Sequence, residues 1–144
     1  MADTTDAQAP AKALPSPILS PESQGFWAAA REGRFMLGHC QACEKVFWYP
    51  RALCPHCFSA STGLKAAAGG GTVYSYSVMR RVKIPYALAY VTLDEGVTVL
   101  TNLVAADLDR IRVGMPVELA FVPAEDGAAV PVFRPSGVQQ EASA

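Results

Sequence analysis

The sequence predicts a mainly β protein made of two modules, with one short helix ahead of them. Three observations carry this prediction. All four cysteines fall in two C-x2-C pairs within residues 40–57. From Thr72 onward, apolar and polar residues alternate in stretches rich in β-branched and aromatic types, which is typical of strands. The helical pattern is confined to about three turns near the N-terminus, a length too short to be stable alone.

Length, composition and charge limit the classes of protein to which this chain can belong. The chain has 144 residues, 51% of them hydrophobic, and a net charge of −1. This composition can build a core and gives no overall attraction to phosphate polymers. No apolar run reaches about eighteen residues, and the N-terminus lacks a basic segment followed by an apolar one. We therefore expect a cytoplasmic protein without a membrane span, in a compartment that keeps thiols reduced.

The two ends and the helix come first. Residues 1–17 and 136–144 are polar or small with no apolar period, and we expect disordered tails there. The helix is expected within residues 18–33, with Ser20 as its N-cap, Pro21 in its first position and Gly33 at its C-terminal cap.

This helix carries an aromatic face. Phe26 and Trp27 share it with Ala30. A helix of three turns needs a surface to dock on, which is either the rest of its own chain or a partner protein.

Residues 34–62 are predicted to form a zinc ribbon. The ligands would be the two pairs of the pattern C-x2-C-x10-C-x2-C, namely Cys40, Cys43, Cys54 and Cys57. Each pair can offer both sulfurs to one ion from a single turn, and four thiolates match tetrahedral zinc with Zn–S near 2.3 Å. Four protein ligands leave no position for a reactive water, so the predicted site is structural.

Other readings of the cysteines stay open. Four thiolates also bind iron, as in rubredoxins. Disulfides would need an oxidising compartment, and a thioredoxin-like pair would need a βαβ context. His39 and His56 flank the cysteines and are expected to be surface neighbours of the site. Many zinc knuckles have Gly after the second cysteine of each pair, where this chain has Glu44 and Phe58.

Residues 63–71 read as a flexible linker and residues 72–135 as a small barrel. Five short strands are expected at 72–82, 86–93, 97–104, 117–123 and 130–135. Turns are expected at 94–96 and at Asp126-Gly127, and a short helical turn between the third and fourth strands. Five antiparallel strands with a helical turn in that place are typical of an OB-fold.

The ordered set of motifs resembles one known family over residues 15–134. The stretches that carry the resemblance are "GRF", "YPRALCP", "GGGTVYSYSVM", "PYALAYVTLDEG" and "IRVGMPVELAF", together with the aromatic helix and the cysteine pairs. The family combines a rubredoxin-like zinc ribbon with an OB-fold and is associated with acyl-CoA metabolism. The segment "RRVKIPY" is shorter here than in many relatives.

The resemblance implies a function. Family members are non-catalytic accessory subunits of thiolase-like, hydratase or aldolase enzymes, and they help to bind or channel acyl-CoA. It implies that this chain holds structural zinc and is part of a hetero-oligomer. Exposed aromatic residues near the ribbon are the candidates for partner binding: Phe26, Trp27, Phe47 and Trp48. The one basic cluster is the candidate for contact with the phosphates of CoA: Arg80, Arg81 and Lys83.

Two competing functions can be weighed from the sequence. Zinc ribbons and OB-folds also bind single-stranded nucleic acid, and the barrel tyrosines could stack on bases. However, residues 71–134 hold six basic and seven acidic side chains, without the basic excess that a phosphate-tracking groove needs. A stand-alone enzyme is disfavoured because no phosphate-binding loop, nucleophile motif or other catalytic set is visible.

Overall fold

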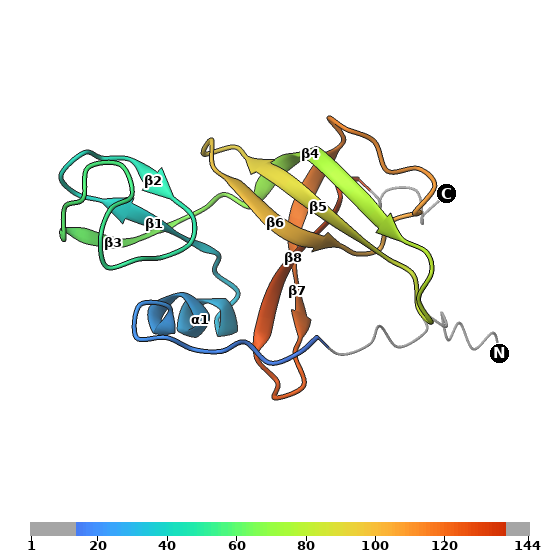
Figure 1. Ribbon diagram of the computed structural model, residues 1–144, viewed down its shortest axis with the longest axis horizontal. Helices are drawn as coiled ribbons and strands as arrows, with labels where there is room; N and C mark the ends of the chain where they lie inside the picture. Colours follow the sequence, from blue (N-terminus) through green and yellow to red (C-terminus); the bar gives the residue numbers. More distant parts are fainter. Residues whose placement is uncertain (1–13, 138–144) are drawn as a thin grey trace.

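The computed structural model describes residues 14–137 and shows a ribbon, a helix and a closed barrel (Figure 1). The elements are α1 (Gln24–Arg31), β1 (Met36–Cys40), β2 (Val46–Phe47), β3 (Thr62–Ala66), β4 (Gly70–Met79), β5 (Tyr86–Leu93), β6 (Thr98–Leu103), β7 (Pro116–Pro123) and β8 (Ala129–Pro135). The mainly β class predicted from the sequence is confirmed. No helix among the described residues is long and apolar enough to cross a membrane.

Helix α1 is shorter than expected at its start. Residues 21–23 form a turn, and the N-cap is Ser23 rather than Ser20. The buried Ser23 hydroxyl accepts a hydrogen bond from the Ser20 backbone N–H at 3.0 Å. This hydrogen bond closes the turn ahead of the helix. The predicted end is right: Gly33 has φ +79°, and the N–H groups of Gly33 and Arg34 bond to the carbonyls of Ala30 and Ala29.

The ribbon is a three-stranded antiparallel sheet in the order β2-β1-β3. Its third strand corrects the sequence-based boundary, because residues 63–66 belong to β3 and residues 70–71 already belong to β4. The expected flexible linker is thus reduced to residues 67–69. Strand β3 pairs with β1 along its whole length, from Met36 opposite Ala66 to Cys40 opposite Thr62. Pairing with a neighbouring strand, rather than local propensity, makes this stretch a strand.

The barrel closes in the order β4-β5-β6-β8-β7, with β4 pairing back to β7. Strands β6 and β8 meet in parallel at a single registered pair, Leu103 and Phe133. The loop between β6 and β7 contains a turn in which the N–H of Arg110 bonds to the carbonyl of Asp107 at 2.9 Å, where the sequence predicted a helical turn. This is the five-stranded arrangement of an OB-fold.

The ribbon, the helix and the barrel share one hydrophobic core. Phe26 from α1, Phe35 and Leu37 near β1, and Phe133 from β8 are all buried in it with the inward-facing barrel residues. Phe35 packs edge-on against Phe133, with ring centroids 6.2 Å apart. The two predicted modules are therefore fused through a common interior.

The described part of the N-terminal segment is also held in place. Leu14 forms a parallel bridge with Ala124, and the Ser16 hydroxyl accepts a hydrogen bond from the Asp126 N–H at 3.1 Å. The tail predicted for residues 1–17 is therefore wrong for residues 14–17, which run along the β7–β8 turn. Residues 1–13 and 138–144 lie outside the described residues. At the other end, the N–H of Ser136 bonds to the carbonyl of Pro116, so residue 136 is still attached to the barrel.

Candidate metal centre and the groove beside it

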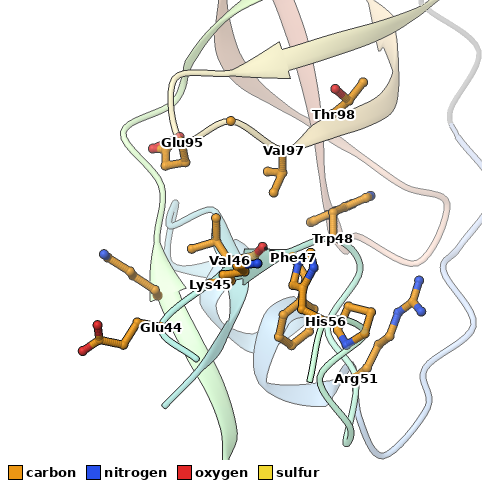
Figure 2. Close-up of a pocket in the computed structure, with 13 residues that line it drawn as sticks. Glu44, Lys45, Val46, Phe47, Trp48, Arg51, His56, Glu95, Val97 and Thr98 are labelled. Atoms are coloured by element: carbon orange, nitrogen blue, oxygen red, sulfur yellow. Dashed lines mark hydrogen bonds between the residues drawn. The ribbon is translucent and has the colours of Figure 1, made fainter. Parts of the chain in front are cut away.

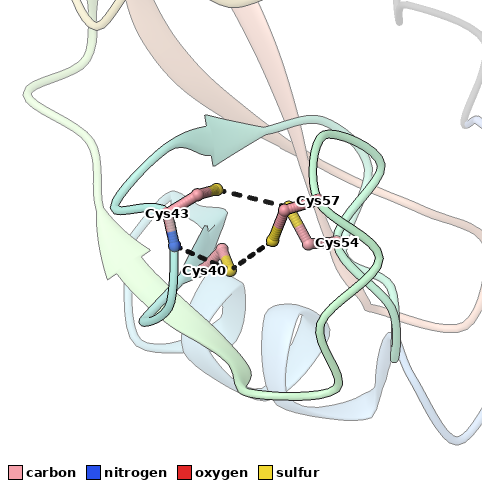
Figure 3. A group of neighbouring side chains, drawn as sticks. All are labelled: Cys40, Cys43, Cys54 and Cys57. Carbon is pink, nitrogen blue, oxygen red and sulfur yellow. Dashed lines mark hydrogen bonds between the residues drawn. The ribbon is translucent and has the colours of Figure 1, made fainter.

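The four cysteines meet at the end of the ribbon. Their Sγ atoms all lie within 4.8 Å of one another, because two turns that are separated along the sequence face each other there (Figure 3). The Sγ atoms of Cys40 and Cys57 are 3.6 Å apart, and those of Cys43 and Cys54 are 3.7 Å apart. A tetrahedron with Zn–S near 2.3 Å would place its sulfurs about 3.8 Å apart. The donor set and its spacing therefore fit a single tetrahedral metal ion.

Each cysteine pair sits in a turn closed by the residue that follows it. The N–H of Glu44 bonds to the carbonyl of Cys40, and the N–H of Phe58 bonds to the carbonyl of Cys54, both at 2.9 Å. Glu44 and Phe58 have φ values of +62° and +63°, the left-handed conformation for which knuckles commonly use Gly. The turn geometry of a zinc knuckle is thus present without the glycines, at a cost in backbone strain of about 1–2 kcal/mol per residue.

Backbone N–H groups favour the ionised form of two thiols. The N–H of Cys43 points to Cys40 Sγ at 3.5 Å and lowers the pKa of the Cys40 thiol. Burial raises the pKa of Cys54, but the N–H groups of Cys57 and His56 outweigh it and lower this pKa to about 6. The N–H of Ser59 lowers the pKa of Cys57, yet burial and the neighbouring sulfurs raise it to about 11.

The neighbouring sulfurs contribute in opposite directions, because they lower the pKa values of Cys40 and Cys54 and raise that of Cys57. Four thiolates this close repel one another, so in the absence of a cation some of them must keep their protons. A divalent metal ion would relieve that repulsion and hold all four as thiolates.

The four aromatic candidates for partner binding separate into two classes. Phe26 and Phe47 are 1% and 3% exposed, so the expectation that they are surface residues is wrong. Phe26 is surrounded by the rings of Trp27, Trp48 and Tyr49, with centroids 5.0 to 5.5 Å away. Trp27 and Trp48 are half-buried and keep part of their surface open to a partner.

Phe47 covers the cysteines from inside the ribbon. It forms a small buried cluster with Cys40 and Cys54. Its ring also lies directly over Gly38, where an added Cβ would be 2.2 Å from Phe47 Cε2. The position can therefore only be glycine while the ring keeps its place.

A groove of about 710 Å³ runs between the ribbon and the hairpin turn that joins β5 to β6. In Figure 2, Val97 of that turn points toward Val46 and Trp48 of the ribbon, and these residues make an apolar floor. Three cationic side chains line the groove, Lys45, Arg51 and Lys65, and the His56 ring lines it as well. Two carboxylates, Glu44 and Glu95, line it as well.

Glu95 is hydrogen-bonded to the short segment that joins the ribbon to the barrel. Its Oε2 accepts the Ala68 N–H at 3.0 Å, while its buried Oε1 has no protein hydrogen-bond partner. The sequence placed Asp94, Glu95 and Gly96 in a tight turn, and the structure confirms it, with φ +92° at Gly96.

The basic cluster predicted to meet CoA phosphates is not part of this groove. Arg80, Arg81 and Lys83 lie between β4 and β5 and are all exposed. Arg80 forms an ion pair with Asp109 at 2.7 Å, so one of the three positive charges of this cluster is neutralised.

Sequence reasoning missed the groove cations. Lys45, Arg51 and Lys65 are separated along the chain and line one groove only in the folded protein, where the pairing of β3 with β1 brings Lys65 beside the ribbon. Their nearness to the cysteine turns is the one signal that could have singled out Lys45 and Arg51. Lys65 had none, because its segment reads as a linker.

Family models match both parts of the chain. Residues 27–63 match "ChsH2, rubredoxin-like zinc ribbon domain", and residues 64–122 match "ChsH2, C-terminal OB-fold domain". The two matches follow one another without a gap, in the order that the structure shows.

Curated relatives agree with these matches. The chain is 37% identical over 139 residues to the "Probable enoyl-CoA hydratase alpha subunit" of Thermomonospora curvata, covering 93% of this chain but 44% of that protein. It therefore spans less than half the length of this relative. It is also 36% identical to the "DUF35 domain-containing scaffold protein" of Methanothermobacter thermautotrophicus, covering 57% of this chain and 67% of that one.

A solved structure has the same architecture over its full length. The match is a chain of the "Ltp2-ChsH2(DUF35) aldolase", with a TM-score of 0.76 and 36% identity over 84% of this chain and 99% of that chain. The motifs, the cysteine geometry, the closed barrel and these similarities agree. The chain belongs to the ChsH2/DUF35 family, in which a rubredoxin-like zinc ribbon is followed by an OB-fold domain.

Proposed function

We propose that this chain is a non-catalytic scaffold subunit that assembles with a thiolase-like or hydratase-type enzyme acting on acyl-CoA. The observation that carries the proposal is the likeness along 99% of the chain of the Ltp2-ChsH2(DUF35) aldolase structure, in which a chain of this kind is part of an aldolase. The relative called a hydratase alpha subunit carries the same module within a longer chain. The names of both proteins point to assembly with an enzyme rather than to a free-standing module.

The chemistry of the described residues supports a structural role for the cysteines. All four sulfurs face one point, so a bound ion would have a full set of protein ligands and no open position for substrate. We propose zinc as that ion, with iron as the alternative that the same sulfurs could hold. Bound zinc would hold the two cysteine turns together, and Cys40, Cys43, Cys54 and Cys57 would be its ligands.

We also propose that the groove beside the ribbon receives the phosphate-bearing end of acyl-CoA. Lys45, Arg51 and Lys65 can offer positive charge to phosphate oxygens, and the indole of Trp48 gives an apolar surface next to them. This assignment replaces Arg80, Arg81 and Lys83 as the expected phosphate contact. It puts acyl-CoA at the boundary of ribbon and barrel. We propose the cytoplasm as the place of the assembly, a compartment that keeps thiols reduced and free to bind a metal.

The scaffold role is tested by reconstitution. The full chain is mixed with the purified Ltp2 subunit of the Ltp2-ChsH2(DUF35) aldolase and passed over a sizing column, and the aldolase activity is measured with and without it. We expect a complex of fixed ratio. Cys54→Ser should lose both zinc, measured by mass spectrometry of metals, and the complex. Turnover of acyl-CoA by this chain alone would overturn the non-catalytic assignment.

The groove is tested separately by calorimetric titration with CoA. Lys65→Ala and Arg51→Ala should each weaken binding by about tenfold, because each removes one charge-assisted contact. Arg81→Ala is the matched control, since it removes an exposed cation outside the groove. Equal weakening by Arg81→Ala would show general charge attraction instead of a site.

A further inference from the structure

The two cysteine turns form part of the groove wall as well as the metal centre. The first turn ends in Glu44 and is followed by Lys45. The second turn holds Pro55 and His56 between its two cysteines. All four of these residues line the groove. In Figure 2, Glu44 and His56 lie on opposite sides of Val46, so a ligand that fills the groove would meet residues of both turns.

Backbone hydrogen bonds connect these groove residues to the cysteines. The N–H of Cys40 bonds to the carbonyl of Lys45 at 3.0 Å. The N–H of His56 points to Cys54 Sγ at 3.3 Å. A shift of either turn would therefore move a groove residue with it, and a ligand that fixes the groove residues would restrain the turns.

The two sides of the groove are also in contact with each other. His56 Nε2 of the second turn is hydrogen-bonded to the carbonyl of Val46, which begins the strand after the first turn, at 3.3 Å. The next residue, Phe47, is buried against Cys40 and Cys54 and lines the groove as well. The groove and the metal centre are thus built on the same few residues of the ribbon.

The positions of two groove cations would let a phosphate-bearing ligand bridge the turns. Lys45 directly follows the first turn, and Arg51 lies three residues before Cys54, on the segment that leads into the second turn. Both side chains line the groove. Phosphate oxygens accept charge-assisted hydrogen bonds from Lys and Arg, so a ligand that binds both cations would hold the two turns together.

We propose that ligand binding in the groove is coupled to metal binding by the four cysteines, so that a phosphate-bearing ligand such as acyl-CoA slows the release of the metal. This inference rests on the proposed acyl-CoA site and adds its regulation. Coupling between two binding equilibria is reciprocal, so the metal-loaded ribbon binds the ligand more tightly than the metal-free ribbon. The scaffold then takes up acyl-CoA tightly only when its metal centre is complete.

Repulsion between the ligand phosphates and the thiolates acts against this coupling. Four thiolates around a divalent ion keep two negative charges that the ion does not balance. The groove cations Lys45, Arg51 and Lys65 offset this charge, and at physiological ionic strength exposed charges are screened beyond about 8 Å. We therefore expect the bridging contacts to outweigh the repulsion.

The test measures zinc transfer from the zinc-loaded full chain to a coloured chelator, with and without acetyl-CoA. Acetyl-CoA carries the phosphates of CoA, but its sulfur is in a thioester and cannot bind zinc as a thiolate. Its Kd for the zinc-loaded chain is first measured by calorimetry. If zinc leaves only when the turns separate, and the ligand is held only while they are together, the release rate falls by one plus the ratio of free ligand to Kd. At ten times Kd, release should be about tenfold slower.

Two groove variants separate a bridge between the turns from mere occupancy. Lys45→Ala removes the cation beside the first turn. Lys65→Ala removes a cation on β3, where Lys65 lies opposite Leu37 rather than opposite a cysteine. Each is measured at ten times its own Kd, so that the occupancy is equal, with zinc content and thermal unfolding as checks on folding. Lys65→Ala should keep the slowing of about tenfold, and Lys45→Ala should reduce it to less than about twofold.

The outcomes distinguish this inference from the proposed acyl-CoA site. Zinc release that bound acetyl-CoA leaves unchanged overturns the coupling and leaves the site intact. Faster release overturns it too, and would show that repulsion by the thiolates dominates. No binding of acetyl-CoA to the zinc-loaded chain overturns both proposals. Equal slowing in the two variants would show general stabilisation of the fold and overturn the bridge between the turns.

Discussion

Gly38 offers a sharp test of how the ribbon is packed. An alanine Cβ at this position would lie 2.2, 2.5 and 2.7 Å from three carbons of the Phe47 ring. Carbon atoms in contact are normally about 3.5–4.0 Å apart, so the ring would have to move by about 1 Å or more. Phe47 is 3% exposed and packed against Cys40 and Cys54, which leaves it little room. Overpacking of this kind costs about 1–3 kcal/mol.

The expected result is a loss of stability that begins in the ribbon. Gly38→Ala should lower the free energy of unfolding by about 1–3 kcal/mol, and the melting temperature by roughly 2–4 °C for each kcal/mol. Zinc transfer to a chelator should also become faster, since Phe47 adjoins the cysteines. Gly63→Ala is the matched control, because Gly63 lies in β3 of the same sheet with nothing within 4 Å of an added Cβ.

A double-mutant cycle isolates the ring contact. Phe47→Ala alone should cost about 3–5 kcal/mol through the void it leaves. In that background Gly38→Ala has no ring to displace, so it should cost close to nothing. The same cost for Gly38→Ala with and without the ring, or a cost no larger than that of Gly63→Ala, would refute the reasoning.

Three other perturbations have defined outcomes. Glu44→Gly should raise the free energy of unfolding by about 1 kcal/mol in thermal or urea denaturation, because glycine adopts φ near +62° without strain. The neighbouring change Lys45→Gly should not stabilise, and equal effects would contradict this account. Phe26→Ala should cost about 3–5 kcal/mol with ribbon and barrel still unfolding in one transition, whereas two transitions by fluorescence and circular dichroism would show separate cores. The N–H of Ala128 lowers the pKa of Asp126 below its ordinary value of 3.8. The ionised carboxylate therefore stabilises the fold above about pH 3.8, and this stabilisation is lost as the pH falls through the pKa of the folded state. Urea unfolding of Asp126→Asn should therefore differ most from the wild type near pH 5 and converge with it at lower pH, and a constant difference would refute the assignment.

The barrel could be read from the sequence with good accuracy. The strand expected at residues 86–93 is β5, Tyr86–Leu93, and the turn at 94–96 follows it. Alternation between a buried and an exposed face leaves a direct trace in the sequence, and so does the demand of a tight turn for Gly. Cysteine spacing likewise predicted which four side chains would meet.

Features that depend on distant parts of the chain could not be read in this way. Strand β3 has small residues and no alternation, and it becomes a strand only beside β1. The burial of Phe26 depends on Phe35, Trp48 and Tyr49, which reach it from the ribbon. The left-handed φ at Glu44 could not be predicted from the preference of glycine for this conformation, because the turn adopts it with glutamate in that position.

The shared core has a consequence for how forces and positions are transmitted. Modules joined by a loose linker move independently, but a common apolar interior suppresses such motion. Phe35, packed against Phe133 of the barrel, ties the ribbon to the barrel wall. The ribbon and the barrel are therefore held at a fixed angle to each other. A protein bound to the ribbon would keep a constant distance and orientation to a molecule bound to the barrel, and a few aromatic contacts would set this geometry.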